Sequence, residues 1–465
     1  MGESVINNLP YLPTDQQVGV IAALSRFVTP GVMSSDSVFL LCGYAGTGKT
    51  SLMGALVKTL SSLNMPVVLM APTGRAAKVF GRFAGKFAST IHRRIYRPPL
   101  PGSGDGFYSV ADNPMRRAIF IVDEASMIGG GDGDGRPSLL EDLIYYVYSG
   151  EDCRMILLGD TAQLPPVGCG ESPAMNPDVL RSMGLKVTRA VMSKTVRQAS
   201  SSGILYNATL LRRAMSRNPL PEPVLYVSRF DDVQSITGEE LEDAISSSYA
   251  EGGIDDTIVV TRSNRRALDY NRAIRARILD REEELCRGER IMVAKNNYLW
   301  SAKVKGLDFI ANGDIATIER IISAEEKYGL RWADVVLSLT DRDISVECKI
   351  MLDTLQSETP ALETDMLRKL ANDILTDPDI FTPSTPMQVR MKMLKTDPYF
   401  NALQVKYAYA VTCHKAQGGQ WSDVYVDMAF ISLETPVIEF YRWLYTSTTR
   451  AVKKLYYISP GVRVE

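Results

Sequence analysis

Short apolar runs recur in the first part of the chain, and each ends at a turn or at a charged residue. They occupy residues 38–42, 67–71, 119–123 and 155–159. Segments of helical length, such as residues 51–63, lie between them. Apolar strands that alternate with helices are typical of a parallel sheet covered by helices on both faces. The pattern therefore predicts an α/β domain that closes near residue 185.

Runs of the same kind return later in the chain, at residues 257–261, 423–429 and 455–459. Long stretches of different character separate the first of these runs from the other two. We therefore predict a second α/β domain built from two pieces, residues 186–299 and 401–465.

The material between these two pieces alternates apolar and polar positions with a period of two. Residues 311–322 and 335–352 follow this pattern, and "TDRD" makes a turn within the second of them. We predict a small β insert within residues 300–400. A helical stretch rich in Pro and Asp, residues 360–398, follows the predicted strands.

A shorter interruption breaks the first α/β domain between two of its strands. Residues 97–117 are rich in Pro, Gly and Asn, which are residues that mark loops and tight turns. The segment is predicted to be a loop or hairpin, with Phe107 and Tyr108 near its tip.

Length and composition narrow the class of protein. A chain of 465 residues is too long for one hydrophobic core. Its six cysteines form no C-x-x-C pair and have no histidine at a spacing that suits zinc. The start of the chain lacks the pattern of a signal peptide, and no apolar run approaches the roughly 20 residues of a membrane helix. We therefore expect a cytoplasmic protein with no membrane partner.

Charge adds little to this picture. The formal net charge is -2, so the molecule as a whole does not attract nucleic acid by its field. Arginines do cluster at residues 92–97, 115–117 and 262–277. Each cluster taken alone is more simply explained as a solvated helix face.

The sequence "GYAGTGKT", residues 43–50, follows a predicted strand and precedes a predicted helix. It fits G-x-x-x-x-G-K-[ST], the phosphate-binding loop of nucleotide hydrolases. The glycines allow backbone N–H groups to surround the phosphates, Lys49 reaches the β and γ oxygens, and Thr50 offers its hydroxyl to Mg²⁺. In this context a chance match is disfavoured.

Two further strand ends complete the predicted chemistry. Asp123 and Glu124 follow the apolar run 119–122, which places Asp123 near Mg²⁺ and leaves Glu124 to activate water. Without the phosphate loop, these two residues would be explained as well by a helix N-cap. Gln163 lies on the loop after the run 155–159, at the edge where α/β sheets bind ligands, and could sense the γ-phosphate. Together these residues predict hydrolysis of a nucleoside triphosphate.

The order of motifs resembles the superfamily-one helicases of the 5′-to-3′ branch, close to the RecD/Dda-like group. The segments that carry the resemblance to motifs Q, Ia, Ib, II, III, IV, V and VI are residues 13–17, 71–77, 89–95, 123–126, 159–168, 194–204, 409–427 and 445–451. They extend from about residue 12 to residue 458. The resemblance implies an α/β fold with two RecA-like P-loop domains, called 1A and 2A, which bind ATP between them and carry single-stranded DNA.

The resemblance also assigns the inserts. Residues 1–185 would be domain 1A, with a small 1B hairpin insert at about 97–117. Domain 2A would comprise residues 186–299 and 401–465, and residues 300–400 would be an SH3-like β insert, called 2B, with a helical extension.

By resemblance, the ATP-binding residues are Gln17, Gly43, Ala45, Gly46, Thr47, Gly48, Lys49, Thr50 and Gly418, with Gln17 on the adenine and Thr50 and Asp123 on Mg²⁺. The catalytic residues are Lys49, Glu124, Gln163 and two arginine fingers, Arg197 and Arg450. The DNA-binding residues are Pro72, Thr73 and His92 on 1A, Thr412, His414 and Lys415 on 2A, and Phe107 or Tyr108 as the wedge that splits the duplex. Gln417 and Gly418 would link the DNA residues to the nucleotide.

The predicted function is an ATP-dependent DNA helicase that translocates 5′ to 3′ and acts on single-stranded and tailed duplex DNA in replication, repair or recombination. A single-strand-binding protein or a replication protein is a further expected partner. The first alternative is an RNA helicase, since viral superfamily-one RNA helicases share this core. The second is a helicase-nuclease, because "DRDISVECK" (residues 341–349) contains acidic residues and E-x-K. A small-molecule kinase would leave everything after residue 190 unexplained.

Overall fold

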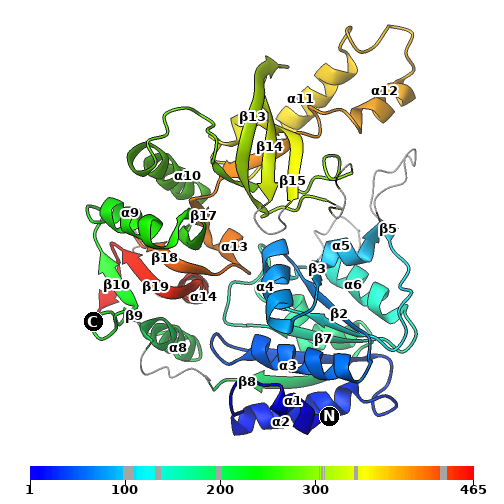
Figure 1. Cartoon of the computed structure of the whole chain (residues 1–465), viewed down its shortest axis with the longest axis vertical. Helices are drawn as coiled ribbons and strands as arrows, with labels where there is room; N and C mark the ends of the chain where they lie inside the picture. Colours follow the sequence, from blue (N-terminus) through cyan, green and yellow to red (C-terminus); the bar gives the residue numbers. More distant parts are fainter. Residues whose placement is uncertain are drawn as a thin grey trace. The chain divides into compact units, whose positions relative to one another are not determined.

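The computed structural model describes residues 1–97, 109–130, 138–194, 202–302, 304, 307, 309–339, 344–429 and 437–465 (Figure 1). These residues form two compact units. The first unit contains residues 1–97, 110–238 and 416–465, and the second contains residues 239–415.

The first unit contains a six-stranded parallel sheet, as the apolar runs predicted. Its strands, in spatial order, are β3 (Ala88–Thr90), β2 (Val67–Ala71), β6 (Ile119–Val122), β7 (Arg154–Gly159), β1 (Ser37–Gly43) and β8 (Lys186–Met192). Strand β8 begins just after residue 185, the predicted end of the first domain, and pairs with β1. Because β8 lies at the edge of the sheet and is partly exposed, it lacks the continuous apolar run that marks the inner strands.

Helices cover both faces of this sheet. On one face, Phe39 and Leu41 of β1 pack with α1 (Gly2–Asn7), α2 (Asp15–Val28), α3 (Lys49–Ser62) and α4 (Gly74–Ala84). On the other face, Val38 and Leu40 pack with α5 (Ile91–Ile95), α6 (Leu139–Tyr148) and α7 (Pro177–Ser182). Alternate residues of β1 therefore enter two separate cores, which explains why the strand has no polar positions facing water.

The remaining elements of the first unit come from the middle and the end of the chain. Strands β10 (Val233–Ile236), β19 (Ala451–Ile458) and β18 (Trp421–Asp427) lie side by side and are parallel. Strand β9 (Val224–Leu225) pairs with β20 (Arg463–Val464). Helix α14 (Ile438–Thr448) packs against α8 (Gly203–Met215).

Strands β4 (Tyr96–Arg97) and β5 (Ser109–Val110) pair at the two ends of the segment predicted to be a hairpin. The tip of that segment, residues 98–108, lies outside the described residues. The predicted wedge residues Phe107 and Tyr108 belong to this tip.

The second unit contains a closed five-stranded barrel, of which β13, β14 and β15 are shown in yellow-green to yellow in Figure 1. Its strands are β12 (Arg290–Val293), β13 (Ile315–Lys327), β14 (Leu330–Leu339), β15 (Ile344–Met351) and β16 (Leu403–Tyr407). Most strand residues lie within the range predicted for the β insert, but β12 precedes residue 300 and β16 follows residue 400. These two strands have four and five residues, too few to show an alternating pattern in the sequence. Helices α11 (Thr364–Leu375) and α12 (Met387–Leu394) occupy the stretch predicted to be helical.

The second unit also has a small α/β part. Strand β11 (Thr257–Thr261) pairs in parallel with β17 (Ala410–Thr412). Helices α9 (Leu241–Gly252) and α10 (Asn264–Ala273) pack on β11, and α13 (Cys413–Ala416) follows β17. Among the helices in the described ranges, none is both long enough and apolar enough to span a membrane.

Candidate nucleotide-binding site

The phosphate-binding loop lies between β1 and α3, as its sequence predicted. Gly43 ends the strand and Lys49 begins the helix. Gly46 and Gly48 have φ angles of 74° and 81°, a region that L residues with a side chain seldom adopt. The buried Thr47 hydroxyl donates a hydrogen bond to the Tyr44 carbonyl at 2.8 Å. The loop is therefore held by its own residues, and its glycines are required by its path.

Lys49 folds back over this loop. Its Nζ donates to the Tyr44 carbonyl at 3.1 Å and also to the Gly43 carbonyl. A Cβ at Gly43 would lie 2.7 Å from the Lys49 side chain, so only glycine leaves room for the lysine here. The ammonium group of Lys49 is thus bonded to two neutral carbonyls at the N-terminus of α3. The helix dipole favours an anion at the same place.

Asp123 and Glu124 follow β6 directly. The Glu124 N–H donates to Asp123 Oδ1 at 2.9 Å, and Glu124 has a left-handed φ of 52°, an uncommon conformation for this residue type. Burial, followed by the charge of Glu124, raises the pKa of Asp123 to about 7. A buried carboxylate in this state gains stability from a nearby cation. Asp123 and the Thr50 hydroxyl therefore fit the oxygen ligands that Mg²⁺ prefers.

A cavity of about 430 Å³ joins these groups within the first unit. The predicted residues that line it are Ala45, Gly46, Gly48, Lys49, Thr50, Asp123, Glu124, Gln163, Gly418 and Arg450. They come from segments as far apart as residues 45 and 450, so the fold gathers one site from most of the predicted nucleotide residues. The volume is of the size expected for a small-molecule site.

Gln17 does not line this cavity in the described structure. Its side chain is buried, and its Nε2 donates to the Thr47 carbonyl at 3.1 Å and to the Tyr11 hydroxyl at 3.3 Å. Its Oε1 accepts from the Thr14 N–H, which closes a capping box at the start of α2. Gln17 therefore supports the phosphate loop from behind, while Pro10 and Tyr11 line the cavity. Contact of Gln17 with adenine stays a prediction.

Gln163 lies on the loop after β7 and is 7% exposed. It lines the nucleotide cavity and also a second cavity of about 370 Å³. Within the described part of the chain its Oε1 has no hydrogen-bond partner. Buried polar atoms are seldom left unpaired in folded proteins, so this amide is available to a ligand or to water.

Arg450 is 3% exposed, and its guanidinium is held by three acceptors, two in its own segment and one at Gly419. Nε donates to the Thr446 carbonyl, Nη1 to the Gly419 carbonyl and Nη2 to the Thr449 hydroxyl, at 3.0 to 3.1 Å. The acceptors are all neutral, so the positive charge is available to an anion in the cavity. The other predicted arginine finger, Arg197, lies outside the described residues.

The predicted DNA residues of the first unit have clear local roles. Thr73 caps α4, because its hydroxyl accepts from the Ala76 N–H at 3.2 Å, and Pro72 precedes it. His92 lies in α5 with its ring 5.6 Å from the ring of Tyr96, and burial lowers its pKa. A histidine with a lowered pKa is neutral at physiological pH, so His92 can form hydrogen bonds or stack but carries no charge there.

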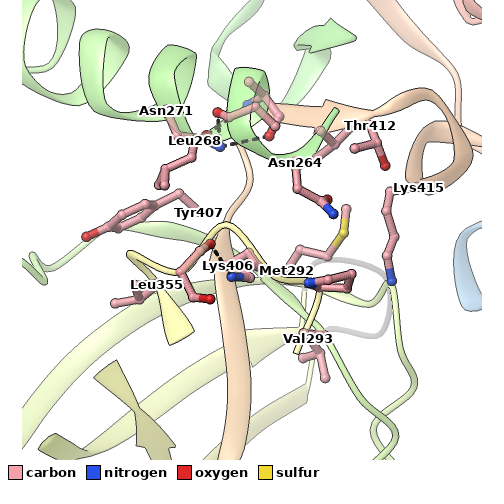
Figure 2. A pocket seen from close by; sticks show the side chains of 16 residues that line it. Asn264, Leu268, Asn271, Met292, Val293, Leu355, Lys406, Tyr407, Thr412 and Lys415 are labelled. Carbon is pink, nitrogen blue, oxygen red and sulfur yellow. Dashed lines mark hydrogen bonds between the residues drawn. The ribbon is translucent and has the colours of Figure 1, made fainter. Parts of the chain in front are cut away.

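The predicted DNA residues of the second unit lie where β17 passes into α13. His414 is exposed, and Lys415 Nζ donates to Asn312 Oδ1. Thr412 and Lys415 line a small cavity of about 50 Å³ together with Asn264 and Lys406, as Figure 2 shows. Two lysines at one cavity give this edge of the unit a local positive charge that the neutral total conceals.

The sequence did not single out Tyr445, although it lies inside the segment that resembles motif VI. Its hydroxyl accepts a hydrogen bond from the Ala45 N–H of the phosphate loop at 2.9 Å. Because Ala45 and Tyr445 are 400 residues apart, no local pattern in the sequence marked this contact.

Gln417 was expected to link the DNA residues to the nucleotide, and its Nε2 donates to the Leu164 carbonyl at 2.6 Å, next to Gln163.

Comparison with known protein families gives two matches. Residues 25–218 match the AAA domain family, and residues 407–458 match the UvrD-like helicase C-terminal domain family. The two matched segments contain the phosphate loop and the segments that resemble motifs V and VI, respectively.

Several curated proteins are similar to this chain. The ATP-dependent RecD2 DNA helicase of Deinococcus radiodurans is 36% identical over 138 residues, which is 30% of this chain and 17% of that protein. The ATP-dependent DNA helicase dda of Enterobacteria phage T4 is 31% identical over 135 residues, 28% of this chain and 29% of that protein. The uncharacterized protein R530 of Acanthamoeba polyphaga mimivirus is 21% identical over 491 residues, 91% and 95% of the two chains. The chain thus matches less than a third of the two named helicases.

Among solved structures, a Pif1 helicase from Bacteroides in complex with ADP-AlF3 and single-stranded DNA aligns with a TM-score of 0.48 at 14% identity, over 96% of this chain and 92% of that chain. The Pif1 helicase from Candida albicans aligns with a TM-score of 0.46 at 16% identity, over 97% and 94%.

Proposed function

Because the chain belongs to the superfamily-one helicases of the RecD/Dda-like type, we propose that it is an ATP-dependent DNA helicase. It would translocate 5′ to 3′ on single-stranded DNA and unwind duplex DNA. The observation that carries this proposal is the cavity of the first unit, which brings Lys49, Asp123, Glu124 and Arg450 to one place. Binding of a nucleotide alone does not require these four side chains together. Transfer of the γ-phosphoryl group to water uses all four of them.

The phosphate loop and the first turn of α3 would bind the β- and γ-phosphates. Lys49 would leave the carbonyls of Gly43 and Tyr44 and pair with phosphate oxygens. This exchange is favourable because a lysine gains more from an anionic oxygen than from a neutral carbonyl. Asp123 and Thr50 would hold Mg²⁺, which neutralises charge on the β- and γ-phosphates when bound.

Glu124 would orient and deprotonate the attacking water, since it follows Asp123 and lines the same cavity. Gln163 would contact the γ-phosphate, and Arg450 would stabilise the charge that spreads over it in the transition state. Arg197 keeps its proposed role as a second arginine finger on the resemblance alone.

Single-stranded DNA would contact Pro72, Thr73 and His92 in the first unit and Thr412, His414 and Lys415 in the second. Hydroxyls, two imidazoles and one lysine suit contacts to the phosphate backbone and bases that do not read sequence. We also propose that residues 97–117 form the 1B insert with Phe107 or Tyr108 as the wedge, and that the barrel is the SH3-like 2B insert. Domain 1A would extend past residue 185, because β8 pairs with β1.

A cytoplasmic location, and a single-strand-binding or replication protein as a further partner, complete the proposal. No observation favours the nuclease alternative. Lys349 of the E-x-K sequence is engaged by Glu325 at 2.7 Å and Asp334 at 3.0 Å. In the described ranges no group of three His, Cys, Asp or Glu residues could hold a metal ion.

Unwinding of duplexes that carry a single-stranded tail tests the proposal. Duplexes with a 5′ tail or a 3′ tail are incubated with the protein, ATP and Mg²⁺, and strand separation is measured. We expect separation of the 5′-tailed duplex only, with none when ATP is omitted. Preference for the 3′ tail would contradict the direction. Stimulation of ATP hydrolysis by RNA and not by DNA would favour the RNA helicase.

A further inference from the structure

Helix α14 ends beside the nucleotide cavity, and Tyr445 near its C-terminus is 1% exposed. The Tyr445 hydroxyl accepts from the Ala45 N–H at 2.9 Å and donates to Asp160 Oδ2 at 2.7 Å. Ala45 belongs to the phosphate loop, and Asp160 begins the loop that carries Gln163. One hydroxyl therefore joins the two loops that would contact the β- and γ-phosphates.

The direction of these hydrogen bonds is fixed by chemistry. Burial, followed by the charge of Asp160, raises the pKa of Tyr445 far above its ordinary value, so the phenol keeps its proton at physiological pH. An N–H group can only donate and a carboxylate can only accept. The Tyr445 hydroxyl must therefore point its proton at Asp160, and no second arrangement satisfies both partners.

Asp160 in turn shapes the loop that follows it. The residue is 1% exposed, and its Oδ1 accepts from the Ala162 N–H at 3.0 Å. Its carbonyl accepts from the Gln163 N–H at 3.2 Å. The Asp160 carboxylate thus holds the turn that presents Gln163 to the cavity, and Tyr445 holds the carboxylate.

A second contact fixes the same loop on the other side of Gln163. The Leu164 N–H donates to the Thr446 hydroxyl at 2.8 Å, and Gln417 donates to the Leu164 carbonyl. Residues 160 and 164 are therefore both bonded to the part of the first unit that contains α14. Gln163 lies between these two attachments, so a shift of its loop changes the hydrogen bonds of α14.

We propose that Tyr445 is a positioning residue that makes the nucleotide site distinguish a triphosphate from a diphosphate. It keeps the phosphate loop and the Gln163 loop at the spacing at which Lys49 and Gln163 reach the same γ-phosphate. Through the hydrogen bonds of Asp160 and Thr446, binding of a γ-phosphate would also shift α14. The inference rests on the proposed ATP site but requires no DNA and no unwinding.

The test compares Tyr445→Phe with Tyr441→Phe. Tyr441 lies one turn earlier on α14, is fully buried, and donates its hydroxyl to the Pro221 carbonyl, so it is a matched control. Equilibrium affinities for ADP and for a non-hydrolysable ATP analogue are measured with Mg²⁺ and without DNA. Tyr445→Phe should weaken binding of the ATP analogue about tenfold, as expected for loss of a buried hydrogen bond to a charged group, and change ADP binding less than about twofold.

Asp160→Asn provides the second variant and should give the same selective loss. Because both side chains act through one contact, the double variant should lose no more than either single variant. Equal weakening of both nucleotides, or an effect of Tyr445→Phe no larger than that of Tyr441→Phe, would overturn the inference. Additive losses in the double variant would also overturn it.

The same preparations separate this inference from the proposed function. Selective triphosphate binding that depends on Tyr445, together with no DNA-stimulated hydrolysis, would support the inference and contradict the helicase. DNA-stimulated hydrolysis with an unchanged nucleotide preference in Tyr445→Phe would do the reverse. Thermal unfolding of each variant shows that the compared proteins are folded, and Asp160→Asn carries the test if Tyr445→Phe does not fold.

Discussion

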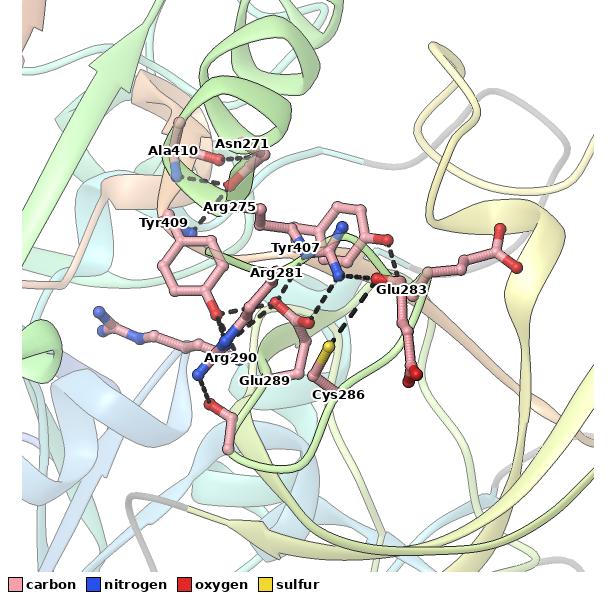
Figure 3. Close-up of polar contacts among 12 residues, drawn as sticks. Asn271, Arg275, Arg281, Glu283, Cys286, Glu289, Arg290, Tyr407, Tyr409 and Ala410 are labelled. Carbon is pink, nitrogen blue, oxygen red and sulfur yellow. Dashed lines mark hydrogen bonds and ion pairs between the residues drawn. The ribbon is translucent and has the colours of Figure 1, made fainter. Parts of the chain in front are cut away.

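Each unit contains a buried polar network, and the two networks differ in what surrounds them. In the first unit, Tyr445 and Asp160 lie beside the nucleotide cavity. In the second unit, Glu289 is fully buried and pairs with Arg275 at 3.0 Å and Arg281 at 3.3 Å, as Figure 3 shows. The Tyr409 hydroxyl donates to Glu289 at 2.8 Å. Both networks combine a buried carboxylate with a tyrosine hydroxyl.

The network around Glu289 is closed on itself. Its carboxylate accepts from two arginines and a tyrosine, and Tyr409 also accepts from the Arg290 N–H at 3.1 Å. The bonds tie the first barrel strand to the end of α10 and to the chain that leaves β16. Such an arrangement fixes the base of the barrel and leaves no acceptor of this carboxylate for a ligand.

The network of the first unit lies instead beside polar groups that have no hydrogen-bond partner in the described residues. Gln163 Oε1 and Ser126 Oγ are buried without a partner in the described part of the chain, and both face the 370 Å³ cavity. The pKa of Asp123 is raised to about 7. Unpaired polar atoms, a perturbed acid and an open cavity together mark a site that binds a ligand. Burial of charge alone does not.

The largest effect is expected from Lys49→Ala. The rate of ATP hydrolysis should fall on the order of 10³-fold or more, since a cation on the transferred phosphoryl group is lost. The urea midpoint should hardly change, because Lys49 is bonded only to carbonyls of its own loop. Lys58→Ala, on the exposed face of the same helix, is the control and should hydrolyse ATP normally. Normal hydrolysis by Lys49→Ala would show that the cavity is not the site of ATP hydrolysis.

Glu289→Gln should instead lower the stability of the protein and leave nucleotide binding unchanged. The buried Arg275 and the partly buried Arg281 lose their counter-charge, which costs about 3 kcal/mol of unfolding free energy by the usual penalty for breaking a buried ion pair. Urea unfolding measures this loss, and nucleotide affinity should stay the same. Glu326→Gln, at an exposed position of β13, is the control. If Glu289→Gln were as stable as the control and lost nucleotide binding, the contrast between the two networks would be wrong.

His414→Ala should reduce the stimulation of ATP hydrolysis by single-stranded DNA about fivefold, as expected for loss of about 1 kcal/mol from one contact. Hydrolysis without DNA should be unchanged, since His414 does not line the nucleotide cavity. Steady-state rates over a DNA titration measure both quantities. Equal loss with and without DNA would place His414 in the nucleotide site.

The smallest effect concerns Lys406, a partly buried lysine of the second unit. Burial lowers its pKa from 10.5 to about 8, so the unfolded chain binds more protons between these two pH values, and stability rises with pH across that window. Lys406→Met removes this dependence. At pH 7 the variant should gain about 1 kcal/mol relative to the wild type, after allowance for solvent screening, and the gain should shrink toward pH 10.

Urea unfolding at pH 7 and pH 10 checks this prediction. Lys295→Met, at an exposed position near β12, is the control and should show no such trend. A gain in unfolding free energy for Lys406→Met that stayed constant or grew with pH would contradict the lowered pKa of Lys406.

Most of the residues predicted for the nucleotide site line one cavity, because local spacing determines where they lie. The loop from Gly43 to Thr50 is contiguous, and Asp123 and Gln163 each follow a strand of the same parallel sheet. Their side chains therefore meet at one edge without further information. The role of Tyr445 could not be predicted in this way, because it depends on a contact with Ala45 from 400 residues away.

Other features of the structure could not be predicted from the sequence for similar reasons. Gln17 was expected to face the ligand, but its amide also satisfies the Thr47 carbonyl and an N-cap, and only the packed structure shows which partner it takes. The start of the barrel was missed because β12 has four residues. The DNA residues stay predictions because Thr73 and His92 belong to one unit and His414 and Lys415 to the other.

The account depends most directly on Glu124, which lines the nucleotide cavity beside Asp123. Steady-state ATP hydrolysis, with Mg²⁺ and with or without single-stranded DNA, is compared between the wild type and Glu124→Gln. The account predicts DNA-stimulated hydrolysis in the wild type. It also predicts a loss on the order of 10²-fold in Glu124→Gln, which should still bind ATP. Equal turnover by the two proteins would contradict it.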